Sequence, residues 1–368
     1  MAEPLKAMYN ELFIRQFGER VRKEWEPFDS ERFAALTLAE GWDELELKGR
    51  MRRITVSLGA ALPADYPEAL TILEAISPEC RGFPYLLFPD FVQVYGLGHW
   101  ERSIAALERF TALSSAEFSV RPFILRDPER MMEQMFAWAG HSDEHVRRLA
   151  SEGCRPRLPW ADALPAFKKD PSPIMPILER LKADPSEYVR RSVANNLNDI
   201  SKDHPELVLE LAKRWSGDNA ATDALLKHAC RTLIRASANP EALSLFGLNE
   251  PAGVEVIRWE PSASAVPSGG EIEIAYEVGL PGESGAKLRL ELAVTYPRKG
   301  GRSYRKMFKL SEKSIAGGAT LAGKRRLDFR DLSTRKHEPG AHRLALIVNG
   351  RELASAEAVL LEGGAERG

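Results

Sequence analysis

Apolar side chains recur at three- and four-residue spacing through the first two thirds of the chain. Two such runs are Leu5, Met8, Leu12, Ile14, Phe17 and Val21, and Ile104, Leu107, Phe110 and Leu113. This spacing is typical of amphipathic helices, which gather their apolar residues on one face. Prolines such as Pro128 and Pro205 separate the runs, and a proline is well tolerated in the first turn of a helix. We predict a domain of many short helices over residues 1–248.

The pattern changes to strict alternation after Leu248. Apolar and polar residues alternate at 272–278, 288–294 and 344–348. The last run leads into Asn349-Gly350, a strong signal for a two-residue hairpin turn. Several short alternating strands in about 110 residues favour an immunoglobulin-like β-sandwich. We predict a small all-β domain over residues 254–362.

A short motif occurs twice in the helical part. Val146-Arg147-Arg148 recurs as Val189-Arg190-Arg191, and a weaker copy contains Val120-Arg121. The offset between the two valines falls in the range of roughly 40–47 residues that is typical of HEAT repeats. We therefore predict an all-α, HEAT-like helical repeat solenoid. Stacked repeats would align their arginines along one edge, which gives a basic wall suited to a phosphate backbone.

Composition narrows the class of protein. The chain has 368 residues, 44% of them apolar and 28% charged, which suits a protein with a sizeable core. Its three cysteines lie far apart, so we expect no zinc site, no disulfide and no cofactor. The N-terminus lacks a continuous apolar segment, and no apolar run approaches the roughly 18 residues of a membrane span. We expect a cytoplasmic protein without a membrane partner.

The net charge of −2 conceals a basic segment in the β domain. From Arg298 to Arg343 there are fourteen lysines or arginines and only four acids. A surface that serves solubility alone, which is the alternative, would mix the signs more evenly. We predict that this domain contacts nucleic acid. The candidate residues are Arg298, Lys299, Arg302, Arg305, Lys306, Lys324, Arg325 and Arg326.

Two carboxylates and an aromatic residue near the motifs suggest chemistry as well as binding. Glu152 and Trp160 follow the first Val-Arg-Arg motif, and Glu117 precedes the weaker copy. Glu152 could instead be a helix-terminal acid paired with Arg148 or Arg155, although the helix dipole disfavours a carboxylate at that end. Trp160 stands among prolines and arginines, where a core tryptophan is unusual.

The runs 91–124, 146–160 and 188–215 resemble the AlkC branch of the HEAT-like alkylation-repair DNA glycosylases, in polar as well as apolar residues. The resemblance covers residues 60–248. It implies an enzyme, which we expect to be a monomer, that removes N-alkylated bases from duplex DNA, notably 3-methyladenine and 3-methylcytosine. It also implies that the damaged base is not turned out into a deep pocket, unlike in most glycosylases. Some members carry an added immunoglobulin-like domain, which suits the β-rich segment here.

The chemistry of such a reaction fits the residues present. A base alkylated at N3 is cationic and leaves as a neutral molecule, so positive charge develops on the sugar as an oxocarbenium ion. A carboxylate at roughly 4 Å stabilises that charge by about 4 kcal/mol at an effective dielectric near 20, or about three powers of ten in rate. An aromatic ring adds about 1–2 kcal/mol. Glu152 and Glu117 are the candidate catalytic carboxylates, and Trp160 is the candidate ring.

The other polar residues allow two interpretations. We expect one arginine of each motif to form a salt bridge between repeats and the other to bind phosphate, and Asn195 could bridge repeats or bind DNA. The candidates on the helical domain are Arg147, Arg148, Arg155, Arg157, Arg190, Arg191 and Asn195. A non-catalytic adaptor that binds DNA or protein remains the alternative, and it would need neither Glu152 nor Trp160.

Overall fold

The computed structural model describes residues 4–235, 239–250, 253–331 and 336–362. These form two compact units. The first contains Met1–Val208 and Arg214–Ala229, and the second contains Leu209–Lys213 and Cys230–Gly368. The first unit is helical and the second carries the strands, so the predicted order of an all-α domain followed by an all-β domain is confirmed.

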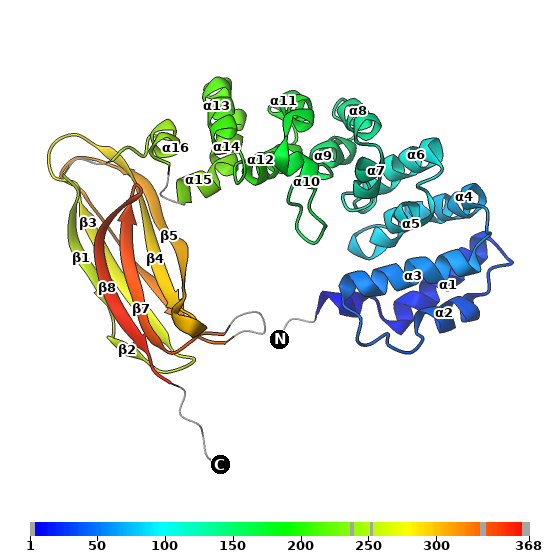
Figure 1. The fold of residues 1–368 in the computed structure, drawn as a ribbon, viewed down its shortest axis with the longest axis horizontal. Helices are drawn as coiled ribbons and strands as arrows, with labels where there is room; N and C mark the ends of the chain where they lie inside the picture. The colour runs from blue at the N-terminus through cyan, green and yellow to red at the C-terminus, as the bar shows by residue number, and fades with distance from the viewer. Residues whose placement is uncertain (1–3, 236–238, 251–252, 332–335, 363–368) are drawn as a thin grey trace, which may run out of the picture. The chain divides into compact units, whose positions relative to one another are not determined.

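The first unit is an array of helices stacked in chain order (Figure 1). Several of the helices begin with an aspartate N-cap or with a proline in the first turn. The N-cap side chains of Asp65, Asp127 and Asp143 accept hydrogen bonds from backbone N–H groups. The helices are α1 (Glu11–Glu24), α2 (Ser30–Thr37), α3 (Leu47–Ala61), α4 (Tyr66–Ile76), α5 (Leu87–Tyr95), α6 (Trp100–Thr111), α7 (Arg121–Arg126), α8 (Pro128–Trp138), α9 (Glu144–Glu152), α10 (Pro165–Lys169), α11 (Met175–Leu181), α12 (Glu187–Ile200), α13 (Pro205–Trp215) and α14 (Ala220–Ala229).

The two Val-Arg-Arg motifs occupy matching positions in this array. The first lies in the first turns of α9 and the second in the first turns of α12, and these two helices pack against each other. Val146 and Val189 are both buried, so each anchors its helix, while of the arginines that follow Arg191 is exposed and the other three are half-buried. Helix α12 packs in turn against α14, which continues the stack.

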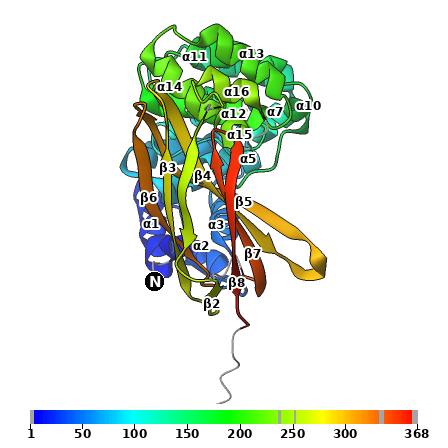
Figure 2. The same ribbon diagram turned by 90° about the vertical axis from the view of Figure 1, so that its left-hand side faces the viewer.

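The second unit is a sandwich of two sheets. One sheet has the order β1-β3-β6 and the other β2-β8-β7-β4-β5. Their inner faces form a common apolar core that includes Ile272, Ile274, Leu292 and Leu344, and the sheets lie face to face in Figure 2. The strands are β1 (Glu255–Pro261), β2 (Ala265–Val266), β3 (Glu271–Gly279), β4 (Ala286–Pro297), β5 (Ser303–Ile315), β6 (Thr320–Asp328), β7 (Gly340–Val348) and β8 (Arg351–Leu360).

The turn between β7 and β8 ties the end of the helical segment to the sandwich. Asn349 and Gly350 both have positive φ, 45° and 86°, as the predicted hairpin turn requires. The Asn349 side chain donates to the carbonyls of Asn249 and Lys287 at 2.7 and 2.9 Å. Helices α15 (Arg231–Arg235) and α16 (Pro240–Leu245) belong to the second unit, whereas the predicted boundary at 248 assigned them to the helical domain.

Candidate active site

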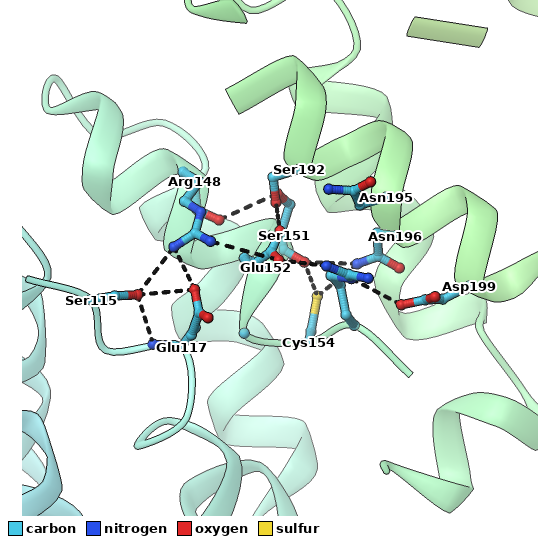
Figure 3. A network of polar contacts seen from close by, with 12 residues as sticks. Ser115, Glu117, Arg148, Ser151, Glu152, Cys154, Ser192, Asn195, Asn196 and Asp199 are labelled. Carbon is cyan, nitrogen blue, oxygen red and sulfur yellow. Dashed lines mark hydrogen bonds and ion pairs between the residues drawn. The ribbon is translucent and has the colours of Figure 1, made fainter. Parts of the chain in front are cut away.

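Arg148 connects the two predicted catalytic carboxylates (Figure 3). Its guanidinium lies 2.6 Å from Glu117 Oε2 and 3.6 Å from Glu152 Oε1. Glu117 lies in the turn before α7, and Glu152 is the last residue of α9. Burial disfavours the charge of Arg148, but the two carboxylates more than offset it and raise its pKa. The arrangement therefore holds two carboxylates near one fixed cation.

Further donors fix the orientation of Glu152, whose exposed fraction is only 5%. Arg155 donates to Glu152 Oε1 at 2.6 Å, and the Ser192 hydroxyl donates to Oε2 at 2.7 Å. Arg155 also donates to Asp199 at 2.9 Å. A carboxylate at the C-terminal end of a helix is destabilised by the negative end of the helix dipole. The hydrogen bonds from Arg155 and Ser192 offset this effect on Glu152.

Helix α12 contributes a row of side chains at four-residue spacing on the face toward α9. The row comprises Tyr188, Ser192 and Asn196. The Arg148 guanidinium lies 5.2 Å from the Tyr188 ring centroid, and Asn196 donates to the carbonyl of Ser151 at 2.8 Å. Burial raises the pKa of Tyr188, and Glu117 and Glu152 add to that rise. Sequence reasoning missed Tyr188 because its place in the site depends on how α9 and α12 pack.

Trp160 lies in a turn, and its side chain is 60% exposed. Its φ of 61° is in the left-handed region, which bulky residues rarely adopt. The Phe83 ring meets it edge to face, with ring centroids 6.4 Å apart. The loop that carries Trp160 follows Glu152 directly, so the exposed ring belongs to the same part of the chain as the buried carboxylate.

Arg121 holds the loop that carries Trp160. Its guanidinium donates to the carbonyls of Gly153, Arg155 and Asp162, at 3.0 and 2.9 Å for the first two and 3.1 Å from Nε to the third. Burial lowers the pKa of Arg121 to about 10, so the side chain still carries its charge at neutral pH. Arg121 comes from the weaker copy of the repeated motif and was not among the predicted site residues.

The structure distributes the predicted DNA-binding arginines of the helical unit among different environments. Arg147 makes a two-point salt bridge with Asp184, at 2.7 and 3.0 Å, between α9 and the turn before α12. Arg190 donates to the carbonyls of Asp184 and Pro185. Arg191 is exposed, and among the residues that the structure describes it has no hydrogen-bond or ion-pair partner. Only one arginine of the second motif is therefore committed to a protein contact.

The remaining candidates of the helical unit are also placed. Arg155 is buried in the carboxylate cluster rather than exposed in a loop, because the loop folds back so that Arg155 reaches Asp199. Arg157 is partly exposed and makes a two-point salt bridge with Asp203, at 2.6 and 3.1 Å. The side-chain oxygen of Asn195 accepts a hydrogen bond from His228 Nε2 of α14 at 3.0 Å.

In the β unit the two basic clusters differ. Lys324 lies 2.7 Å from Glu273, and Arg326 lies 3.7 Å from both Glu271 and Glu273, so their charges are largely balanced on the sheet. Arg325 instead lies over the ring of Phe308, 5.5 Å from its centroid. The hairpin between β4 and β5 lines a pocket of about 520 Å³.

Most cations of this hairpin lack acidic partners. The residues that line the hairpin pocket include five cations (Arg298, Lys299, Arg302, Lys306 and Lys336), the two tyrosines Tyr296 and Tyr304, and one acid, Glu338. These five cations make no ion pair within the described ranges. Arg305, just outside the pocket, lies 3.5 Å from Glu352. The unbalanced positive charge of the sandwich is thus concentrated at the β4–β5 hairpin.

Both halves of the chain are similar to known proteins. Residues 100–233 match the family described as DNA alkylation repair enzyme, and residues 255–362 match the C-terminal Ig-like domain of the uncharacterised protein YhaZ. The chain is 46% identical over 346 residues to Bacillus subtilis YhaZ, covering 94% of this chain and 96% of the relative. It is 40% identical to the alkylpurine DNA glycosylase AlkC of Pseudomonas fluorescens, solved bound to DNA with an abasic site analogue.

The likeness to that structure extends over both units, with a TM-score of 0.94 and coverage of 98% of this chain and all of the other. The chain belongs to the AlkC family. As a member of the AlkC family it is an alkylation-repair DNA glycosylase, that is, a hydrolase. The predicted resemblance is confirmed, and the family favours an enzyme over the non-catalytic adaptor. No described helix of this AlkC-family chain is long and apolar enough to span a membrane.

Proposed function

We propose that the chain hydrolyses the N-glycosidic bond of cationic N-alkylated bases, including 3-methyladenine and 3-methylcytosine, in duplex DNA. The observation that carries this proposal is the pair Glu117 and Glu152, held 2.6 and 3.6 Å from the two ends of the Arg148 guanidinium. A cationic base needs no general acid to leave. What the reaction demands is stabilisation of the charge that appears on the sugar, and carboxylates fixed in advance supply it without reorganisation.

Arg148 fixes the positions of the two carboxylates. Its guanidinium lies 2.6 Å from Glu117 and 3.6 Å from Glu152, so one cation holds both side chains in place before the sugar becomes cationic. Ser192 and Arg155 hold Glu152 in one orientation, and Ser115 donates to Glu117 at 3.0 Å. The oxocarbenium ion would therefore meet carboxylates that are already oriented.

The exposure of Trp160 supports a reaction in which the lesion stays within the duplex. Its ring is largely open to solvent, with one edge contact to Phe83. An exposed ring can pack against a deoxyribose at the surface of the helix, where it offers a cation–π face to the developing charge. A flipped base would instead need an enclosing pocket that reads its edges.

Duplex DNA carrying the lesion is the proposed partner. On the helical unit, Arg191 is the candidate with an uncommitted charge, while Arg157 and Asn195 lie partly exposed. On the β unit, the hairpin pocket with Arg298, Lys299, Arg302 and Lys306 is the proposed phosphate contact, and Lys336 joins it. The paired residues Lys324 and Arg326 contribute less, because Glu271 and Glu273 already balance them. Arg147 and Arg155 have a structural role in this proposal, because both form salt bridges within the helical unit.

Release of free base from duplex DNA tests the proposal. The purified full-length chain is incubated with DNA methylated at purine and cytosine nitrogens, and released bases are separated and quantified. We expect 3-methyladenine and 3-methylcytosine among the products, with the backbone left intact until alkali is added. Neutral uracil or unmodified bases should stay attached. If no methylated base is released by enzyme in excess over DNA, the proposal is wrong.

A further inference from the structure

A lysine from the N-terminal helices contacts both segments of the candidate active site. Lys48 Nζ donates to the carbonyl of Trp160 at 2.7 Å. The same ammonium lies 4.8 Å from the centroid of the Phe118 ring, and Phe118 directly follows Glu117. Lys48 comes from the first turn of α3, far outside the residues 100–233 that match the repair-enzyme family.

The charge of Lys48 does not stabilise the helix that carries it. Its side chain is exposed, in the first turn of α3, where the helix dipole disfavours a cation. No acidic residue stands in that turn. Among the described residues, the contacts of the ammonium are the Trp160 carbonyl and the Phe118 ring. The interactions that favour this placement are therefore those with the active-site segments.

The carbonyl that Lys48 binds belongs to a backbone that needs restraint. Trp160 has a φ of 61°, and such a conformation persists in a bulky residue only where surrounding contacts determine it. Arg121 restrains the loop on both sides of Trp160, through Gly153, Arg155 and Asp162. Lys48 restrains Trp160 itself. The Phe83 ring then limits the direction in which the indole can turn.

We propose that Lys48 is a positioning residue, which fixes the Trp160 turn relative to the Glu117 segment and so makes the N-terminal helices part of the active site. Lys48 acts through Trp160, not on the sugar, because a cation beside an oxocarbenium ion would oppose its formation. The kinetic side of this inference rests on the proposed glycosylase function, whereas its structural side does not.

Fluorine NMR tests whether Lys48 positions Trp160, and this measurement does not require enzymatic activity. The chain has seven tryptophans, and 5-fluorotryptophan labelling gives each its own resonance. The Trp160 resonance is identified by its loss in Trp160→Phe. We expect Lys48→Met to shift the Trp160 resonance, Lys48→Arg to restore it in part, and Lys23→Met to leave it in place. Lys23 is an exposed lysine of α1, so its replacement changes net charge equally. An unmoved Trp160 resonance in Lys48→Met overturns the inference.

Single-turnover kinetics test the other side. With enzyme in excess and saturating, Lys48→Met should slow base release by up to about tenfold, because a residue that acts through Trp160 cannot cost more than removal of the Trp160 ring. Combined with Trp160→Ala, it should cause no further loss. Effects that multiply, or a loss confined to DNA affinity and its salt dependence, would mean that Lys48 binds phosphate instead. If wild type releases no base, the glycosylase proposal fails, and the fluorine result still decides the role of Lys48.

Discussion

Replacement of Glu152 by glutamine removes one of the two carboxylate charges of the candidate active site while it keeps the shape of the side chain. The amide oxygen can still accept from Arg155, which donates at 2.6 Å to Oε1 in the native chain. The amide nitrogen then takes the place of Oε2, where the Ser192 hydroxyl donates at 2.7 Å and can rotate to accept instead. Loss of the charge-assisted bonds costs about 1.5–3 kcal/mol of folding free energy. An alanine would leave Arg155 and Arg148 underpaired and cost about 3–5 kcal/mol.

The effect on the chemical step should be larger. A full carboxylate at roughly 4 Å from the sugar stabilises the transition state by about 4 kcal/mol. Because Arg148 and Arg155 share the charge of Glu152, part of this is already screened. We therefore expect the single-turnover rate to fall by about two to three powers of ten. DNA affinity should change little, because the charge on the sugar exists only in the transition state.

The assay is base release with saturating enzyme in excess, so that neither binding nor product release limits the rate. Glu133→Gln is the matched control, since Glu133 is an exposed acid of α8 whose replacement changes net charge equally. Thermal melting identifies any loss of folded protein. A Glu152→Gln rate within about threefold of wild type, with the fold intact, would refute the catalytic assignment.

Four further predictions follow from the same contacts. Trp160→Ala should lower the single-turnover rate by about tenfold, corresponding to about 1–2 kcal/mol of lost cation–π stabilisation, with little change in melting temperature because the ring is exposed. Base release should persist in EDTA, and borohydride should trap no covalent adduct even though Lys48 lies near the candidate active site. Inhibition by EDTA would contradict a metal-independent enzyme, and a trapped adduct would contradict a monofunctional one. Arg147→Met should destabilise the fold by about 2–4 kcal/mol, because it leaves the buried Asp184 without its cation, yet leave the rate of folded enzyme unchanged. The double variant Arg298→Ala, Arg302→Ala should reduce the slope of log K for DNA binding against log salt by about 1.8 if both residues contact phosphate. The double variant Lys324→Ala, Arg326→Ala should change this slope much less, because acidic neighbours already pair with both residues. Equal slopes for the two double variants would contradict a hairpin contact.

The sequence predicted the elements well because local periodicity determines them. The Val-Arg-Arg spacing anticipated that α9 and α12 would be equivalent helices, and the alternating runs anticipated the sandwich with its turn at Asn349. Glu117, Glu152 and Trp160 could be selected as candidates because their chemistry is unusual for their local positions. The ion pair of Glu117 with Arg148, next to Glu152, was not predicted, because Glu117 and Arg148 are more than thirty positions apart.

The parts that sequence could not predict are those decided by tertiary packing. Whether Arg147 or Arg148 faces the carboxylates depends on where Asp184 lies when α12 packs against α9. Arg155 was a candidate for binding DNA, yet it is buried because its guanidinium donates to the buried Asp199. Lys48 carries no local signal at all, because its partner is 112 residues away.

The left-handed backbone at Trp160 has a consequence for how this protein can be improved. A left-handed residue with a side chain costs about 1–2 kcal/mol relative to glycine, which adopts the same φ freely. Glycine at 160 should therefore stabilise the fold, but it would remove the ring that we propose lies beside the sugar. A general search for thermostable variants would tend to find Trp160→Gly, together with the roughly tenfold loss of rate expected when the ring is removed. We expect the same substitution, used deliberately, to give a sturdier chain that still binds the lesion but turns it over more slowly, which would make it suitable for capturing the substrate complex before the base departs.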